Sequence, residues 1–169
     1  MIARAQQVLE QMPPLSGRPI EVRYRRESAH VHAGSFLRER RISLDPSLRA
    51  DEREFARILV HEIFHFVWLR LGNARRLSFE ALMEEEWRCG TGGELGWSAE
   101  WRKAALRRHD VERRSRAWRL YCCESFCDTA AWLFAGVGRH DEFTLDGRAR
   151  RLRRSWFGGL LRSLRTLPV

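Results

Sequence analysis

The sequence predicts a compact α+β domain in which a small β-sheet packs against two long apolar helices. Two observations lead to this fold class. Residues 19–45 contain short runs in which apolar and polar side chains alternate, as in strands with one buried face. Residues 51–71 and 115–137 are apolar nearly all round a helical turn, which is typical of helices buried in a core.

The chain has the length and composition of one globular domain. It has 169 residues, of which 44% are hydrophobic, and this is enough to bury a core, so we expect a single domain over 1–169. No apolar run reaches the roughly 18 residues of a membrane span, and the first residues lack the apolar segment of a secretory signal. We therefore expect a cytoplasmic protein with no membrane partner. Three of the four cysteines crowd into residues 122–127, which suits reduced thiols better than a disulfide framework.

The net charge of +9 prompts the question of nucleic-acid binding. Arginine supplies all of the basic residues except Lys103, which is typical of a compositional bias. The arginines are also spread along the chain in separate pairs, and only 148–154 forms a dense cluster. We therefore expect a solvated basic surface that contacts polyanions weakly, and not a specific nucleic-acid site.

The N-terminal third predicts a short helix followed by a sheet. Residues 1–12 read as an amphipathic helical segment that ends at Pro13-Pro14. After it, Ile20, Val22 and Tyr24 alternate with polar residues. Two further extended runs, 30–36 and 40–44, flank a charged turn, so the region predicts a β-hairpin or meander.

The first long helix carries clear signals at both ends. Asp51 is a suitable N-cap, and Glu54 follows three residues later, as in a capping box. Gly72-Asn73 is a normal C-terminal signal. The helix should therefore span 51–71.

The rest of the chain predicts mostly helix. We expect a short helix over 77–86, a glycine-rich loop over 89–96, a polar helix over 99–108, a second buried helix over 115–137, a strand stub over 142–145 and a basic C-terminal tail over 148–169. The tail should be an amphipathic helix interrupted at Gly158-Gly159.

The first buried helix contains the sequence HExxH, formed by His61, Glu62 and His65. Residues four apart lie on one helical face, so both imidazoles can reach a single metal ion. Glu62 lies about 100° round the helix, where its carboxylate can accept a proton from a water molecule that the metal activates. Without a metal, two histidines and a glutamate in an apolar helix would be costly to bury. The pattern therefore predicts a metal site, with Zn²⁺ as the expected ion and Glu62 as the catalytic base.

A catalytic zinc site needs a third protein ligand. Glu124 begins an ExxxD sequence with Asp128 on the second buried helix. Glu142 begins another with Asp146 beside a turn, and the acidic run 84–86 offers a third choice. Glu124 is favoured because acids in a buried helix usually have partners, and a metal ion with a ligating histidine supplies both.

An HExxH helix followed by an ExxxD helix resembles the gluzincin group of zinc metallopeptidases, to which thermolysin and neprilysin belong. The resemblance implies that His61, His65 and Glu124 bind zinc, that Glu62 is general base and acid, and that Asp128 orients His61. It also implies a zincin-like fold, with the strand region that ends near residue 45 as a sheet whose edge lines the cleft. The implied function is cleavage of a peptide or protein substrate. The resemblance covers under half of the chain, so we expect a minimal zincin-like domain.

Peptidases of this group also carry a tyrosine or histidine that stabilises the oxyanion. No motif identifies it in this sequence, and His140, Tyr121 and His109 are the candidates. Two alternatives to the peptidase stay open. One is a regulatory zincin domain that acts on or binds a single partner protein without general proteolysis. The other is an arginine-rich nucleic-acid-binding protein with a structural metal. Nothing in the sequence assigns an oligomeric state.

Three smaller features accompany the metal motif. Cys123 and Cys127 share a helical face, and we expect buried, inert thiols there. Cys89 lies in the glycine-rich loop, from which it could approach and block the metal. His30 and His32 share one face of an expected strand, and such a pair of surface histidines is most often incidental.

Overall fold

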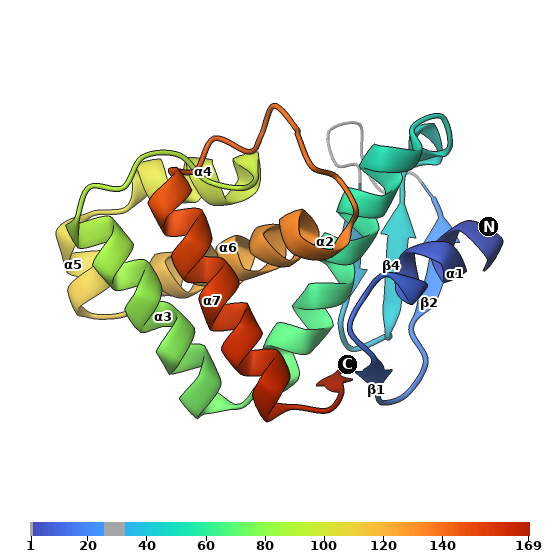
Figure 1. The fold of residues 1–169 in the computed structure, drawn as a ribbon, viewed down its shortest axis with the longest axis horizontal. Coiled ribbons are helices and arrows are strands. Elements are labelled where there is room, and N and C mark those ends of the chain that lie inside the picture. The colour runs from blue at the N-terminus through green and yellow to red at the C-terminus, as the bar shows by residue number, and fades with distance from the viewer. Residues whose placement is uncertain (1, 26–32) are drawn as a thin grey trace.

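The computed structural model describes residues 2–25 and 33–169, with side chains from residue 5 onward. It is an α+β protein, as predicted. Helix α2 (Glu52–Arg70) runs through the middle of the molecule (Figure 1). The small sheet and helix α1 (Ile2–Glu10) lie on one side of it, and the remaining helices lie on the other. None of the described helices is both long and apolar enough to cross a membrane.

The main sheet has three strands in the order β2 (Glu21–Tyr24), β4 (Arg41–Leu44), β3 (Ala33–Phe36). Strands β3 and β4 pair antiparallel, as in the predicted hairpin, but β2 and β4 pair parallel, so the predicted meander is wrong. Ile42 and Leu44 of β4 are fully buried, and the most buried strand therefore takes the centre, where both of its edges are paired. Strand β3 is left as an edge.

Two further strands lie near the sheet, and one part of the predicted sheet is outside the described residues. Strands β1 (Leu15–Ser16) and β5 (Leu167–Pro168) form a separate parallel pair near the two ends of the chain. His30 and His32, expected on one strand face, lie outside the described residues.

Helix α2 begins where the sequence predicts. A 3₁₀ turn, η1 (Pro46–Arg49), is capped by Asp45, and the Asp51 carboxylate then accepts hydrogen bonds from the backbone N–H groups of Arg53 and Glu54. These bonds satisfy donors that the first helical turn leaves free.

The other helices lie near the predicted segments but differ from them in length, and the short helix α5 is an addition. They are α3 (Asn73–Arg88), α4 (Trp97–Ala105), α5 (Arg108–Glu112), α6 (Arg116–Phe134) and α7 (Gly147–Ser163). The predicted strand stub over 142–145 is wrong, because Thr144 and Leu145 donate their backbone N–H groups to the Glu94 carbonyl of the glycine-rich loop without forming a strand. The predicted interruption at Gly158-Gly159 is also wrong, because α7 continues through both glycines. Burial of Phe157 and Leu160 stabilises the helix there against the roughly 1 kcal/mol that each glycine costs.

Aromatic packing fixes α6 against α2. The ring centroids of Phe64 and Phe126 lie 5.8 Å apart, and those of Phe126 and Phe157 lie 5.0 Å apart. All three side chains are fully buried. The ring of Phe64 therefore locks α2 to α6 next to His61 and His65, and this positions the metal motif.

A buried ion cluster ties the helical half together. The Arg153 guanidinium on α7 is fully buried and binds the carboxylates of Glu86 on α3 and Glu94 in the glycine-rich loop, with shortest distances of 2.6 and 2.7 Å. Glu94 also accepts hydrogen bonds from Tyr121 and Ser125 of α6. The loop is therefore held in place although it is rich in glycine.

Candidate metal centre

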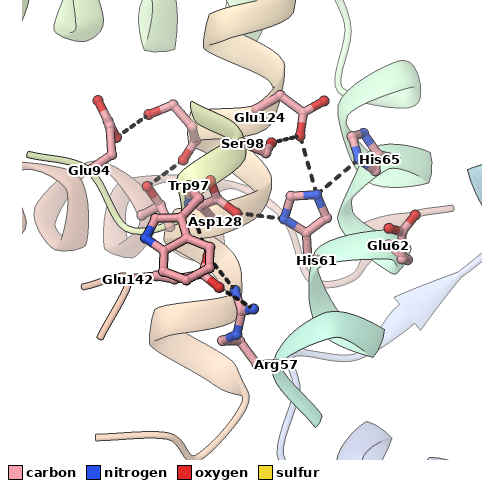
Figure 2. Close-up of polar contacts among 12 residues, drawn as sticks. Arg57, His61, Glu62, His65, Glu94, Trp97, Ser98, Glu124, Asp128 and Glu142 are labelled. Atoms are coloured by element: carbon pink, nitrogen blue, oxygen red, sulfur yellow. Dashed lines mark hydrogen bonds and ion pairs between the residues drawn. The ribbon is translucent and has the colours of Figure 1, made fainter. Parts of the chain in front are cut away.

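His61 and His65 of α2 meet Glu124 of α6 at one point (Figure 2). The two Nε2 atoms of the histidines are 3.2 Å apart, and His61 Nε2 is 3.4 Å from Glu124 Oε2. Ligand atoms of all three residues lie within 4.8 Å of one another. The arrangement brings together the three ligands suggested by the sequence.

These distances and donors fit a zinc ion. Zinc bonds of roughly 2.0–2.1 Å in a tetrahedral arrangement put neighbouring ligand atoms about 3.3 Å apart. The measured separations of 3.2 and 3.4 Å are of this size. Two imidazoles and one carboxylate are also a known donor set of catalytic zinc sites.

Asp128 holds His61 from the side away from Glu124. Its Oδ1 atom lies 2.7 Å from His61 Nδ1. A carboxylate can only accept, so Nδ1 carries a proton, and Nε2 is left as the nitrogen that faces the site and can bind a metal in place of its own proton. Asp128 is almost fully buried, and its Oδ2 atom has no hydrogen-bond partner among the described residues. The carboxylate packs on the backbone of Gly96, where a Cβ atom would come within 2.3 Å of it.

A thiol takes the corresponding place beside His65. Cys123 Sγ lies 3.5 Å from His65 Nδ1. A hydrogen bond from Cys127 lowers the pKa of Cys123 to about 6, since this bond and the contact with His65 outweigh the opposing effect of burial. His65, Cys123 and Cys127 also have ligand atoms close enough to hold a metal. We favour the first group, because all of its members line a cavity, whereas Cys127 is fully buried.

The electrostatics of the site favour a cation. Burial acts to lower the pKa of His61, but Asp128 and Glu124 together raise it well above its usual value. Burial likewise acts to raise the pKa of Glu124, but the hydrogen bond to His61 and the neighbouring imidazoles lower it to about 2. The carboxylates thus stabilise positive charge between the histidines, and a divalent cation meets the same requirement.

Glu62 lies beside the group without belonging to it. Its Oε2 atom accepts a hydrogen bond of 2.6 Å from the Ser35 hydroxyl on edge strand β3. The same hydroxyl lies 2.9 Å from the backbone carbonyl oxygen of Glu62. This contact fixes the carboxylate next to the metal ligands but leaves it free for proton transfer.

A cavity of about 410 Å³ opens over the site. One wall is strand β3 with Leu37, and the opposite wall is α4. The floor holds the metal-binding group with Glu62. The lining residues are Ala33, Gly34, Ser35, Leu37, His61, Glu62, His65, Ser98, Arg102 and Glu124. A substrate could therefore reach both the metal ligands and Glu62 from one side.

Helix α4 supplies two side chains that the sequence did not single out. The Ser98 hydroxyl donates a 2.5 Å hydrogen bond to Glu124 Oε2. One Arg102 nitrogen, Nη2, lies 3.6 Å from Glu124 Oε1, while Nη1 donates to the Ser98 carbonyl. Ser98 and Arg102 are four residues apart and so share one helical face, but only the fold places that face opposite Glu124.

Glu142 sets the position of α4 relative to α2. Its carboxylate accepts a 2.9 Å hydrogen bond from the backbone N–H of Trp97, at the start of α4. It also pairs with Arg57, one turn before His61 on α2, at 2.8 Å (Figure 2). Glu142 therefore has a structural partner and does not join the metal group. It bridges α2, which carries two of the proposed metal ligands, and α4, which forms one wall of the cavity.

The other ligand candidates also lie elsewhere. Glu86 binds Arg153, as described above, and Asp146 caps the first turn of α7. In the run 84–86, Glu84 pairs with Arg88 and Glu85 accepts a weak hydrogen bond from Cys89. Cys89 is exposed and does not line the cavity, so the expectation that it could block the metal is not supported.

None of the three oxyanion candidates lines the cavity. Tyr121 is fully buried and donates to Glu94, and burial with the adjacent carboxylate raises its pKa well above the usual value. His140 lies 3.1 Å from the Glu54 carboxylate. His109 is exposed on α5 beside Asp110. Among the described lining residues, Arg102 is instead the arginine in the cavity wall.

No protein-family model matches the chain, and neither a curated protein nor a solved structure matches it. The function of the protein is therefore inferred from the geometry of the site.

Proposed function

We propose that the protein is a zinc-dependent hydrolase, a metallopeptidase that cleaves peptide bonds in a peptide or protein substrate. The observation that carries the proposal is the group of two imidazoles and one carboxylate, spaced as zinc ligands on the floor of a cavity. Its ligand set and the carboxylate behind His61 resemble those of gluzincins, and we propose a minimal zincin-like fold on this basis.

The residues around the metal group divide the chemistry between them. Zinc, when bound, would lower the pKa of a water molecule toward ~7 and polarise a substrate carbonyl. Glu62 takes the proton from that water and passes it to the leaving amine. Ser35 holds the Glu62 carboxylate during both transfers.

Two features of the cavity suit a peptide. Strand β3 is an edge strand that lines one wall, and an extended peptide can add to such an edge by backbone hydrogen bonds. Arg102 lies in the opposite wall, where its guanidinium can stabilise negative charge that develops on the carbonyl oxygen.

A structural metal is less well supported. Structural zinc sites have four protein ligands, whereas the group around His61 has three members among the residues that the structure describes. The regulatory alternative keeps the same metal site and differs in substrate range, so it is decided by activity and not by geometry.

Zinc stoichiometry tests the proposed ligand set. The wild type should hold one zinc per chain, as measured by elemental analysis after dialysis against a weak chelator. His65→Ala and Glu124→Ala should lose it, because two ligands bind zinc poorly, while Glu62→Gln should retain it. Full zinc content in His65→Ala would exclude this site. If zinc binds as expected but a broad peptide mixture is not cut, the regulatory alternative replaces the general peptidase.

A further inference from the structure

A second hollow adjoins the cavity and is strongly basic. It has a volume of about 700 Å³ and shares Leu37 with the cavity over the metal group. Four arginines line it, Arg18, Arg38, Arg40 and Arg70, together with Ser16, Gly17, Leu37, Leu69, Pro168 and Val169. Leu37 follows the end of edge strand β3, so the hollow continues the line of that strand beyond the cleft.

The positive charge of this hollow is not neutralised by acidic side chains. Among the residues that the structure describes, no aspartate or glutamate lines it, and none of its four arginines forms an ion pair.

Two of the arginines are held in place by backbone groups. Arg40 donates to the carbonyl oxygens of Pro19 and Arg18, and Arg70 donates to that of Phe66. Partial burial and the charges of Arg70 and Arg18 lower the pKa of Arg40. The charges of Arg18, Arg40 and Arg70 are thus close enough to repel one another, and an anion would relieve this repulsion.

The shape and lining of the hollow favour an acidic peptide over a nucleic acid. Sites for single-stranded nucleic acid stack bases on aromatic side chains, and none of the described residues that line the hollow is aromatic. An extended peptide along β3 would pass directly from the cleft to the hollow, where carboxylates could pair with the arginine guanidinium groups.

We propose that the arginine hollow is a substrate subsite that binds acidic side chains on one side of the peptide segment in the cleft. The inference rests on the proposed function, because it names the substrate class of that site. Exposed Arg38 and Arg70 supply the charge, and Leu37 marks the passage from the cleft. The protein should therefore prefer peptides with a cluster of glutamate or aspartate near the bond that it cuts.

Binding and cleavage of one matched peptide pair test the subsite. The pair is a fluorescein-labelled 14-residue peptide with four glutamates at one end and its counterpart with four glutamines, studied by fluorescence anisotropy at low salt. The double variant Arg38→Gln/Arg70→Gln should bind the glutamate peptide about tenfold more weakly than wild type, because it removes two exposed ion pairs that are each weak. The control Arg75→Gln/Arg116→Gln removes the same charge from exposed residues that line neither space, and its affinity should stay within about twofold of wild type.

Three results would overturn the subsite. The first is an equal loss of affinity for the glutamate peptide in the two double variants. The second is equal affinity of the wild type for the glutamate and glutamine peptides. The third is that Arg38→Gln/Arg70→Gln loses binding to a labelled oligothymidine but binds the glutamate peptide as tightly as the wild type. The last of these would assign the hollow to nucleic acid.

Cleavage separates this inference from the proposed function. If the wild type binds the glutamate peptide through the hollow but the zinc-loaded protein cuts no peptide, the proposed hydrolase function is excluded and the hollow is still a site for anions. If it cuts both peptides equally well, the proposed hydrolase function is supported and the proposed subsite is excluded.

Discussion

The carboxylate of Asp128 on α6 and the Nδ1 atom of His61 on α2 lie 2.7 Å apart and join the two long helices at the metal group. The bond fixes the ring of His61 with Nε2 toward His65 and Glu124. Residues that orient a ligating histidine in this way tune metal affinity without binding the metal themselves.

The first prediction concerns this bond. Asp128→Asn keeps the size of the side chain but removes the charge that stabilises the Nδ1 proton, so zinc affinity should fall about 10–100-fold. Competition with a chromophoric chelator measures this affinity, and Glu124→Ala should lose more. The exposed Asp141→Asn is the matched control and should bind zinc as tightly as wild type. An Asp128→Asn variant with wild-type affinity would remove Asp128 from the site.

The second prediction uses the close approach of Gly96. A Cβ atom there would lie 2.3 Å from the Asp128 carboxylate, so Gly96→Ala should push Asp128 away from His61 and weaken zinc binding about tenfold. In the same loop, a Cβ atom at Gly92 meets nothing within 4 Å. Gly92→Ala should therefore leave the affinity unchanged. Equal zinc affinity in the two variants would mean that the contact between Gly96 and Asp128 has no role in metal binding.

The third prediction separates Ser35 from the metal ligands. Ser35→Ala removes the hydroxyl that holds the Glu62 carboxylate, and a hydrogen bond to a charged group is worth roughly 1.5 kcal/mol or more. We expect kcat to fall about tenfold, with KM and zinc content close to wild type. A changed zinc content would show that Ser35 supports the fold of the metal group and not the base.

The fourth prediction concerns the stability of the buried ion cluster. Burial acts to raise the pKa of Glu94, but Arg153 and Lys103 lower it to about 2. Its pKa in the unfolded chain is about 4.5, so its contribution to stability is complete above that pH and is lost as the pH falls toward 2. Glu94→Gln should lower the free energy of unfolding by about 3–5 kcal/mol at neutral pH.

Urea unfolding at several pH values checks this prediction. The difference between wild type and Glu94→Gln should shrink steadily below about pH 4.5, because the wild-type carboxylate becomes protonated. Glu112→Gln removes an exposed partner of Arg108 and should cost less than about 1 kcal/mol at any pH. A difference for Glu94→Gln that does not depend on pH would contradict the assigned charge state.

The sequence predicts the two long helices because their signals are local. Apolar residues at helical spacing and the Asp51 cap define α2, and Ser115 caps α6 in the same way. Residues at i and i+4 on each helix then place the ligand candidates on one face. The HExxH and ExxxD patterns can therefore be recognised from the order of the residues alone.

The remaining features depend on contacts between distant segments. The parallel pairing of β2 with β4 joins residues about 20 positions apart, and no local pattern specifies it. Ser35 reaches Glu62 across 27 residues and Ser98 reaches Glu124 across 26. Tyr121, in contrast, is a candidate that the structure does not place in the site. Its position in the apolar helix fits either a catalytic or a buried role, and only the fold shows its bond to Glu94.

Peptide hydrolysis by the Glu62→Gln variant tests whether Glu62 is the catalytic base of a zinc-dependent peptidase. The amide keeps the shape of Glu62 and its contact with Ser35 but cannot accept the proton from water. With one zinc per chain in both proteins, turnover of a peptide that the wild type cuts should fall by about 10²–10⁴-fold in the variant. Equal turnover by the two zinc-loaded proteins would show that Glu62 has no part in the reaction and would exclude the proposed mechanism.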